Sequence, residues 1–434
     1  MTESVLERGD ARQLWAMLGA EGKAPTEIVS AKHQLSAYSV GVDVWIDRLC
    51  NLYLRELCRK NAHFKLVLAP YGGGKTHFLI ELGLKALNEG YAVSYIPCGS
   101  EASLDNPLDI YRVFAKHIQL PGEDTPGIRN LLRRVVKNKR RLIEASQATD
   151  PDVAFGRWIK KMMGNEYPEN AFGRVMAVAL KAEWDPNTVL SADAAIRWLQ
   201  GDIDSLSKVE REELRLAKIT TKAKAEQGRN LLLSVARFVQ EAGIPGVVML
   251  FDEVETLFNA RGKALLRVLS AMRVLVDIPN GVAGGVPMLG VFSAVPDVLN
   301  ELGKYPALQQ RLAVLGASFD EGNDFATQIL LEKLGAPANL LSAIGVRLVD
   351  VGTLALDYAF DRELQTRNAK ALAHVASERN LDVDARRLYV KTWVNILGLQ
   401  QSGGERLFTD KELAARYQGF FDSLKKIESE DDEP

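Results

Sequence analysis

The run 69–76, Ala-Pro-Tyr-Gly-Gly-Gly-Lys-Thr, constrains the fold of this chain more than any other part of the sequence. It follows the apolar segment 64–68, and its proline and three successive glycines cannot continue a strand or a helix. The sequence therefore predicts a strand that ends where a loop begins. Beyond the loop, apolar residues recur at helical spacing from Phe78 to Ala86, and 91–96 reads as another strand. This order of strand, loop, helix and strand is typical of the opening of a parallel α/β sheet.

The chemistry of the same run indicates phosphate binding. It matches the P-loop pattern except at Ala69, which stands where the first glycine belongs. Successive glycines let backbone N–H groups approach phosphate oxygens with no Cβ in the way, and the helix that follows directs its positive end toward them. Lys75 would bind the β- and γ-phosphates, and the Thr76 hydroxyl would ligate Mg²⁺. The alternative, a glycine-rich turn followed by a chance Lys-Thr pair, does not explain the flanking strand and helix.

We therefore expect ATP with Mg²⁺ as the ligand, held by the loop and by the first turn of the helix. The residues expected to bind it are Tyr71, Gly72, Gly73, Gly74, Lys75, Thr76 and His77. The ring of His77 is expected to pack within its helix rather than to perform chemistry. Lys75 is expected to face solvent, so that Lys75→Ala would abolish ATP binding and leave the fold intact.

Two acids follow a second apolar segment. Residues 247–251 are apolar on both faces, as a central parallel strand requires, and Asp252 and Glu253 come directly after them. Asp252 would hold the magnesium ion through its water shell, and Glu253 would act as general base on the attacking water. The alternative is that both acids merely cap the strand end. Glu255, two residues further on, is expected to form a surface salt bridge.

Two further positions have candidate catalytic roles. Ser293 ends a third apolar strand at 288–292, where a polar side chain can position the water near the γ-phosphate. Polar filling of the core is an equal alternative. Arg311 could reach the γ-phosphate of a neighbouring subunit as an arginine finger in an oligomer, and a structural salt bridge is its alternative role.

The remaining pattern divides the chain into parts. A length of 434 residues favours two or three packed units, and the pattern is helical both between the second and third strands and beyond Asp320. The expected parts are a lead-in at 1–30, the first part of the ATPase core at 31–120, a helical insertion at 121–230, the second part of the core at 231–320, a C-terminal helical domain (a nucleotide lid or a winged-helix-like domain) at 321–427, and a solvated acidic tail at 428–434.

A basic run in the insertion is the candidate surface for nucleic acid. The net charge of −2 predicts no partner, so such contact needs a local patch. The run contains no acid, and its members are Arg129, Arg133, Arg134, Lys137, Lys139, Arg140 and Arg141. Positions 129, 133, 137 and 140 share one helical face, which could follow the phosphate backbone of DNA or could simply be solvated.

We find no charged-then-apolar leader and no uninterrupted apolar run long enough to cross a bilayer. A cytoplasmic protein without membrane contact is therefore expected. The three cysteines form no CxxC pair and are expected to be reduced and buried. The five histidines have no spacing suited to a metal.

Several segments resemble a known family. The segment 64–66 running into 71–79 is similar to the P-loop ATP-binding proteins of the BREX phage-defence systems, of the BrxD type. The likeness continues at 195–201, at 246–257 with its Asp-Glu-Val-Glu, and at 305–308 followed by Arg311. The resemblance implies an AAA+-like ATPase that works in a bacterial antiviral operon beside a DNA methyltransferase and other defence proteins. That family usually has glycine where this chain has Ala69.

The expected fold is thus an α/β P-loop NTPase of AAA+-like type, whose parallel sheet core carries a helical insertion and a C-terminal helical domain. The expected function is an ATPase that acts as a motor or switch in a BREX-like defence complex, with DNA as a candidate ligand. Two alternatives stay open. One is a nucleotide-gated scaffold with little turnover, and the other is an AAA+ loader or regulator of DNA replication or transposition.

Overall fold

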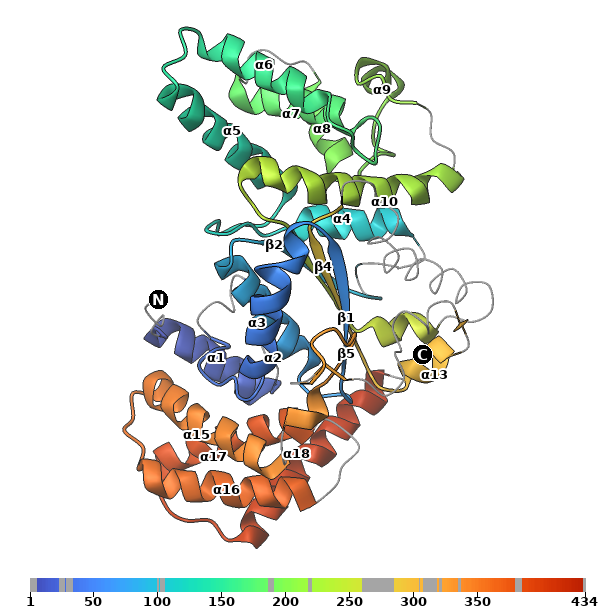
Figure 1. Cartoon of the computed structure of the whole chain (residues 1–434). Helices are drawn as coiled ribbons and strands as arrows, with labels where there is room; N and C mark the ends of the chain where they lie inside the picture. The colour runs from blue at the N-terminus through green and yellow to red at the C-terminus, as the bar shows by residue number, and fades with distance from the viewer. Residues whose placement is uncertain are drawn as a thin grey trace.

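The centre of the protein is a parallel sheet. The computed structural model describes residues 6–22, 28, 34–99, 101, 106–185, 191–217, 221–259, 285–303, 305–306, 318–319, 322–334, 337–378 and 385–431. The sheet has five strands in the spatial order β2-β3-β4-β1-β5 (Figure 1). They are β1 (Ala62–Leu68), β2 (Ala92–Pro97), β3 (Val247–Asp252), β4 (Met288–Ala294) and β5 (Gln328–Leu330). All neighbouring pairs run parallel, so the expected α/β class with a parallel sheet is confirmed.

The sequence did not indicate β5, because the pattern beyond Asp320 is otherwise helical. Its three residues pair in parallel with the last three of β1, from Leu66 to Leu68. A strand this short shows no alternating pattern that periodicity could detect. The sheet therefore continues past the point where only helices were expected.

Strand residues alternate between two hydrophobic cores, one on each face of the sheet. Phe64 and Leu66 of β1 belong to the first core, and Val67 belongs to the second. The first face is covered by α4 (Pro107–His117) and α10 (Thr221–Phe238). The second face is covered by α3 (Lys75–Asn88), which follows the carboxyl end of β1 after the loop 69–74.

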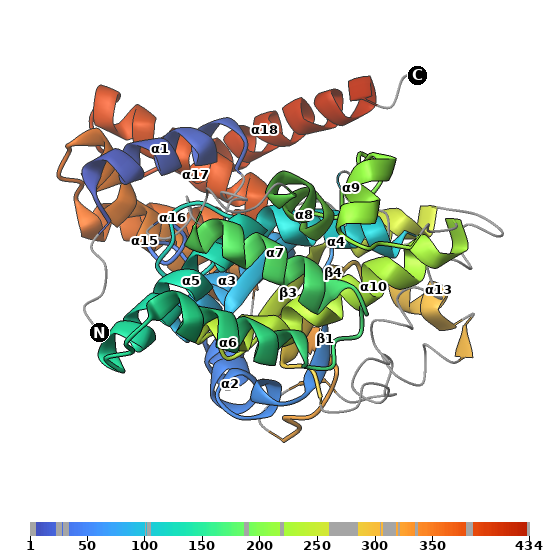
Figure 2. The same ribbon diagram turned by 90° about the horizontal axis from the view of Figure 1, so that it is seen from above.

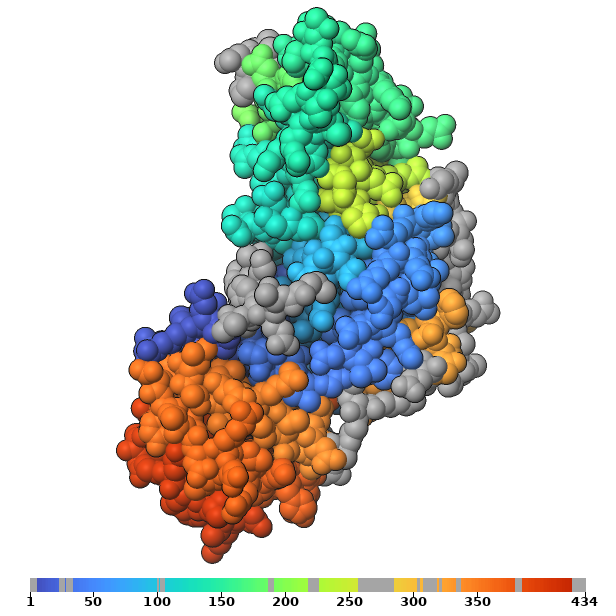
Figure 3. All heavy atoms as spheres, turned by 60° about the vertical axis from the view of Figure 1, so that its left-hand side comes forward, coloured from blue at the N-terminus to red at the C-terminus, as the bar shows by residue number. Residues whose placement is uncertain are grey.

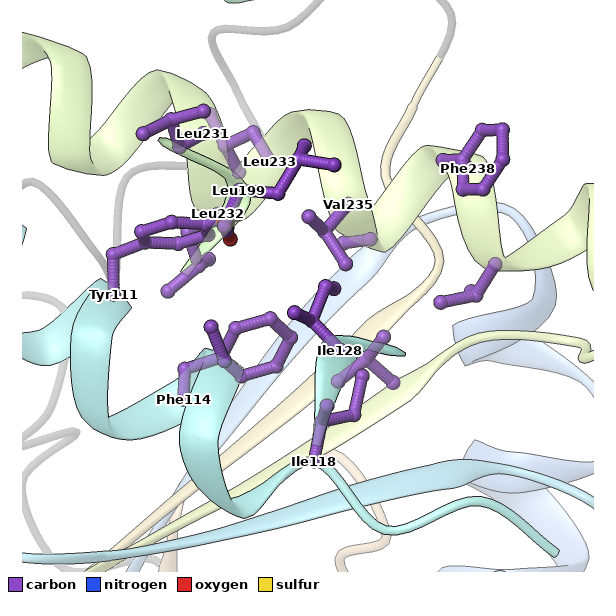
Figure 4. Packing of buried hydrophobic residues seen from close by; sticks show 14 of the residues in the cluster. Tyr111, Phe114, Ile118, Ile128, Leu199, Leu231, Leu232, Leu233, Val235 and Phe238 are labelled. Atoms are coloured by element: carbon purple, nitrogen blue, oxygen red, sulfur yellow. Dashed lines mark hydrogen bonds between the residues drawn. The ribbon is translucent and has the colours of Figure 1, made fainter. Parts of the chain in front are cut away.

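The contact between α4 and α10 is close (Figure 4). Tyr111 and Phe114 of α4 pack with Leu232 and Val235 of α10, and burial of each such side chain contributes about 2 kcal/mol. Gly228 allows this approach, because a Cβ there would lie 2.4 Å from the amide nitrogen of Leu108. Helix α4 thus lies between β2 and α10 (Figure 1).

The stretch before β1 is helical in three winding forms. It consists of α2 (Asp43–Arg48), the π-helical η1 (Leu49–Leu54) and the 3-10 turn η2 (Leu57–Arg59). The buried positions Ile46, Leu49 and Tyr53 lie on one side of this stretch and face the second core.

Lys65 of β1 is buried in this second core. Its ammonium group donates a 2.7 Å hydrogen bond to the Tyr53 hydroxyl and another to the carbonyl of Ala326, and it lies 4.4 Å from the centre of the Phe319 ring. Burial lowers the pKa of Lys65 to about 7. This amine joins β1 to η1 and to the segment that leads into β5.

The stretch expected to be a helical insertion contains no strand among its described residues. Its helices before α10 are α5 (Ile128–Ala145), α6 (Pro151–Met163), α7 (Phe172–Trp184), α8 (Ala192–Leu199) and α9 (Lys208–Glu213). After α10 the turn η3 (Val239–Ala242) leads into β3. In Figures 1 and 3 these helices rise from one end of the molecule, and the last helices of the chain lie at the other.

The C-terminal part is helical and includes the N-terminal helix. The remaining elements are α1 (Arg8–Ala20), η4 (Val254–Asn259), α13 (Val298–Gly303), η5 (Leu331–Leu334), α15 (Pro337–Leu356), α16 (Arg362–Glu378), α17 (Ala385–Gly403) and α18 (Asp410–Asp431). Helix α1 packs on α15 and α17, so the two ends of the chain share one core (Figure 2). Because α18 continues through Asp431, the first residues of the expected acidic tail are helical.

Among the described helices, α15 is the one whose length and apolar composition would suffice to span a membrane. It packs against α1, α16 and α17, and its buried residues include Leu348 and Val349. Its apolar character is therefore accounted for by its place in the C-terminal core.

Candidate functional site

The loop between β1 and α3 turns through two glycines with left-handed backbone. Gly72 has φ +64° and Gly74 has φ +87°, a region that L side chains rarely adopt. The amide of Gly73 donates a 3.0 Å hydrogen bond to the carbonyl of Pro70. Gly74 precedes α3 and offers no side chain to cap it, so the first amides of the helix have no side-chain acceptor at this position.

Residue 73 has to be glycine because Ala69 and Pro70 leave no room for a side chain there. A Cβ at Gly73 would lie 2.6 Å from the Ala69 methyl group and 2.9 Å from the carbonyl oxygen of Pro70. The loop therefore accepts alanine at its first position because it has no side chain at the fifth. A methyl group is thus accommodated within the loop, next to glycines that leave their amides accessible.

Lys75 is buried, and the prediction that it faces solvent was wrong. It is 7% exposed, and its ammonium group donates to the carbonyls of Ala69 at 3.2 Å and Pro70 at 3.3 Å. The same group lies 3.5 Å from Oε1 of Glu255 and 5.1 Å from the centre of the Tyr71 ring. The carbonyls and the carboxylate compensate its charge, which lets the side chain stay inside the loop.

Asp252 at the end of β3 is the centre of the site. It is 1% exposed, and each carboxylate oxygen accepts two hydrogen bonds. Oδ2 accepts from the Thr76 hydroxyl at 2.6 Å and from the Tyr95 hydroxyl at 2.7 Å, and Oδ1 accepts from Ser293 Oγ and from the amide of Glu253. Such a donor set satisfies both oxygens of a buried carboxylate.

Tyr95 was not identified from the sequence. It lies on β2, beside β3 in the sheet, and burial together with Asp252 raises the pKa of its hydroxyl. The hydroxyl therefore stays a neutral donor to Asp252. A signal existed in the polar residues Ser94 and Tyr95 of an otherwise apolar strand, but strand adjacency was needed to use it.

Ser293 is fully buried at the end of β4, between β1 and β3. Its hydroxyl donates to Asp252 and accepts a 3.4 Å hydrogen bond from the amide of Glu253. Ser293 thus contacts Asp252, the residue expected to hold the magnesium ion.

Glu253 begins a turn at the edge of the sheet. It is exposed and has φ +54°, an uncommon conformation for a residue with a side chain. Its carbonyl accepts from the amide of Thr256 at 3.0 Å and from the Thr256 hydroxyl at 2.7 Å. The strained backbone separates the environments of two consecutive acids, since Asp252 is buried and Glu253 reaches solvent.

Glu255 is not on the surface, so the surface salt bridge expected for it was wrong. The turn that starts at Glu253 carries Glu255 back into the protein, where it is 7% exposed and pairs with Lys75. Burial raises the pKa of Glu255, and Lys75 opposes that shift.

Two segments that are distant in sequence contact this region: residues 38–39 contact His77, and Arg386 contacts the loop. The ring of His77 contacts Tyr38 at 5.2 Å and Ser39 Oγ at 2.8 Å, and burial, with Arg386, lowers the pKa of His77 to about 4. The packing partners of the His77 ring therefore lie outside its own helix. Any contact of His77 with a ligand at the loop would come from its backbone amide. Arg386 of α17 donates a 2.6 Å hydrogen bond to the carbonyl of Gly73, a contact that no sequence pattern indicated.

Arg311 lies outside the described residues. The candidate residues that the structure does bring together at the carboxyl edge of the sheet are the loop 71–74, Lys75, Thr76, Asp252, Glu253 and Ser293. Edges of this kind are where ligands bind in open α/β sheets.

The donor set fits magnesium with a nucleotide. Thr76 and Asp252 supply hard oxygen ligands, and Mg²⁺ is commonly held by one or two carboxylates together with substrate phosphates. Bound there, the ion would neutralise phosphate charge. Among the described residues, no cluster of three or more His, Cys, Asp or Glu side chains could hold a metal on its own.

The basic run on α5 is only partly free, because the structure supplies acids that the run itself lacks. Arg129 and Arg133 lie 3.3 Å and 3.8 Å from Glu183 of α7, and Lys139 lies 3.1 Å from Glu241. Arg140 stacks on the Trp184 ring at 4.4 Å. Within this run, all of whose residues the structure describes, Lys137 and Arg141 are the exposed cations for which no such contact is seen.

Comparison with known proteins identifies the family of this chain. A family model described as BREX system ATP-binding protein BrxC/D matches residues 29–405, which include the loop, Asp252 and most of the helical parts. Comparisons with curated proteins and with solved structures found none that matches. The match extends over most of the chain and covers both the BrxC and the BrxD type. The chain therefore belongs to the BREX system ATP-binding protein BrxC/D family.

Proposed function

We propose that this protein is a Mg-ATP-dependent ATPase that acts as a motor or switch in BREX antiviral defence. The observation that carries the proposal is the 2.6 Å hydrogen bond from Thr76 to Asp252, which joins the phosphate loop to the end of β3. The family is one of ATP-binding proteins, and hydrolysis is the part that we add.

The described residues suggest a division of roles. The amides of the loop and Lys75 would bind the phosphates, while Thr76 and Asp252 would hold the magnesium ion. Ser293 and Tyr95 would keep the Asp252 carboxylate oriented. Glu253, which reaches solvent beside this group, would accept the proton of the attacking water.

Steady-state phosphate release tests the proposal. Wild type should release phosphate from Mg-ATP, and Glu253→Gln should bind ATP but release phosphate at least about a hundredfold more slowly, as expected for loss of a general base. Equal rates in the two proteins would contradict the ATPase and leave a nucleotide-gated scaffold. That second candidate is favoured by the buried state of Lys75, whose contacts within the protein oppose rapid exchange of ligand.

We further propose an AAA+-like arrangement and an oligomer. Strand order supports the first, because β4 with Ser293 lies between the loop strand β1 and the acid-bearing strand β3. Arg311 would then act as an arginine finger toward a neighbouring subunit. A light-scattering mass with and without Mg-ATP tests assembly, and a mass that stays monomeric in both would rule out this use of Arg311.

Partners and location follow from the family. Other BREX proteins are the proposed partners, in the cytoplasm, and DNA is a proposed ligand of the exposed cations on α5. A loader or regulator of DNA replication or transposition is the competing role. Loss of phage resistance in a host that lacks only this protein supports the defence role, and unchanged resistance supports the competing one.

A further inference from the structure

Lys75 and Glu255 form a buried ion pair inside the proposed phosphate site. The two side chains are 8% and 6% exposed, and Nζ lies 3.5 Å from Oε1. Both oxygens of Glu255 are shielded from solvent, and the ammonium group of Lys75 is the charged group that lies beside them. A buried carboxylate normally has several donors, as Asp252 has here. Among the described residues, the cation that compensates Glu255 is Lys75.

The same lysine has its donors directed into the protein. An ammonium group has three donors. Those of Lys75 serve the carbonyls of Ala69 and Pro70 and the carboxylate of Glu255. A lysine that binds β- and γ-phosphates needs these donors, so phosphate binding has to exchange some of the present contacts.

The negative charge of Glu255 would repel the phosphates, which also need Lys75. Like charges a few ångströms apart in a poorly solvated site repel strongly, and Glu255 would meet the phosphates at the group that attracts both. Asp252 differs, because its four donors and its contact with Thr76 suit it to the metal. Glu253 differs as well, because it is exposed.

We propose that Glu255 is a positioning residue that competes with nucleotide phosphates for Lys75 and thereby sets the ATP concentration at which the site fills. This inference rests on the proposed nucleotide site at Lys75. Its structural basis is the turn at Glu253. This turn places Glu255 in the protein interior beside Lys75 rather than on the surface. Removal of the charge at constant shape should tighten ATP binding.

The experiment measures ATP affinity in the full chain. Wild type, Glu255→Gln, Asp297→Asn and Lys75→Ala are titrated with a slowly hydrolysed ATP analogue and Mg²⁺. Glu255→Gln should bind about tenfold more tightly. Its KM for ATP should fall to a similar extent, while kcat changes by less than about twofold, because the competition acts on binding. A residue that only supported the fold would not separate KM from kcat in this way.

Asp297→Asn is the matched control. Asp297 is exposed, and its charge acts on Tyr71 of the same loop without contact to Lys75. Its affinity should equal that of wild type. Should Glu255→Gln fold poorly, Glu255→Met fills a similar volume without charge and takes its place in the titration.

The variants distinguish failure of the proposed competition from failure of the proposed nucleotide site. If Lys75→Ala has lost ATP binding but Glu255→Gln binds no more tightly than wild type, the competition is overturned and the nucleotide site stands. If Lys75→Ala binds like wild type, the nucleotide site itself is misplaced and the competition falls with it.

Discussion

The Thr76 hydroxyl donates a 2.6 Å hydrogen bond to Asp252, although 176 residues separate them. This contact closes the site, because it brings the first turn of α3 to the carboxyl end of β3. The parallel sheet makes the contact possible, since β1 and β3 end at the same edge with only β4 between them. Each prediction below depends on a contact around this pair.

Lys75→Ala should abolish ATP binding and should also lower the free energy of unfolding by about 3 kcal/mol, because Glu255 would be left buried without a cation. Urea unfolding measures the second effect. The control is Lys85→Ala on the same helix, whose side chain is 42% exposed and which should cost under about 1 kcal/mol. The double variant Lys75→Ala with Glu255→Gln should recover part of the lost stability. Full stability in Lys75→Ala would show that the ion pair is unimportant to the fold.

Arg386→Ala should weaken ATP binding several-fold. The guanidinium group donates to the carbonyl of Gly73 and so helps to hold the loop in the shape that exposes its amides. Arg387→Ala is a close control, because the neighbouring side chain donates to the carbonyl of Glu21 instead. Calorimetric titration of both variants should show a loss for the first alone. Equal affinities would mean that α17 does not support the loop.

Tyr95→Phe should raise the Mg²⁺ concentration needed for half-maximal ATP binding. The change removes one of the four donors to Asp252 and costs about 1–2 kcal/mol at the carboxylate. Tyr91→Phe removes a hydroxyl that donates to the carbonyl of Leu54, beyond the C-terminal end of α3 and so at the other end of that helix from the site, and should leave the Mg²⁺ requirement unchanged. A titration of ATP binding with Mg²⁺ compares the two. Identical midpoints in both variants would show that Tyr95 does not act through Asp252.

Lys65 should give stability a pH dependence above neutrality. Its pKa is about 7 in the folded protein and 10.5 as the ordinary value, so between these limits the unfolded chain holds a proton that the folded chain does not. The free energy of unfolding should therefore rise with pH across this window, by up to about 1.4 kcal/mol per pH unit, and this contribution should be flat below it. Tyr53, Cys58 and Asp324 are the groups that act on the amine.

Urea unfolding at several pH values tests this, because Lys65→Met should lose that slope. Lys60→Met, at an exposed position just before the same strand, should keep it. A slope that persists in Lys65→Met would assign the dependence to other groups.

Charge reversal at Lys137 and Arg141 should weaken DNA binding and flatten its dependence on salt. These side chains are exposed on α5, so each can release counterions from a phosphate backbone. Reversal of Arg367 and Lys370 on α16, at the other end of the molecule, is the matched control (Figure 1). Fluorescence anisotropy with duplex DNA at several salt concentrations measures both. If wild type does not bind DNA, the basic face is only solvated.

The sequence by itself determined the local parts of this protein. Glycines and a proline interrupt the chain at 69–74 whatever surrounds them, and apolar spacing distinguishes α3 from β1 and β3. The parallel sheet, the loop and the pair Asp252 and Glu253 could therefore be predicted. The same holds for the helical character of the described residues between 121 and 230, because periodicity along one helix needs no distant partner.

Only the tertiary structure decided which side chains meet. Arg386 reaches Gly73 across 313 residues, and Tyr95 reaches Asp252 because β2 lies beside β3. Lys75 and Glu255 were expected at the surface, yet the fold buries them together. Local patterns record how a segment divides its polar and apolar sides, whereas burial and pairing depend on what other segments cover it. Strand order and the turn at Glu253 are therefore what turned separate motifs into one site.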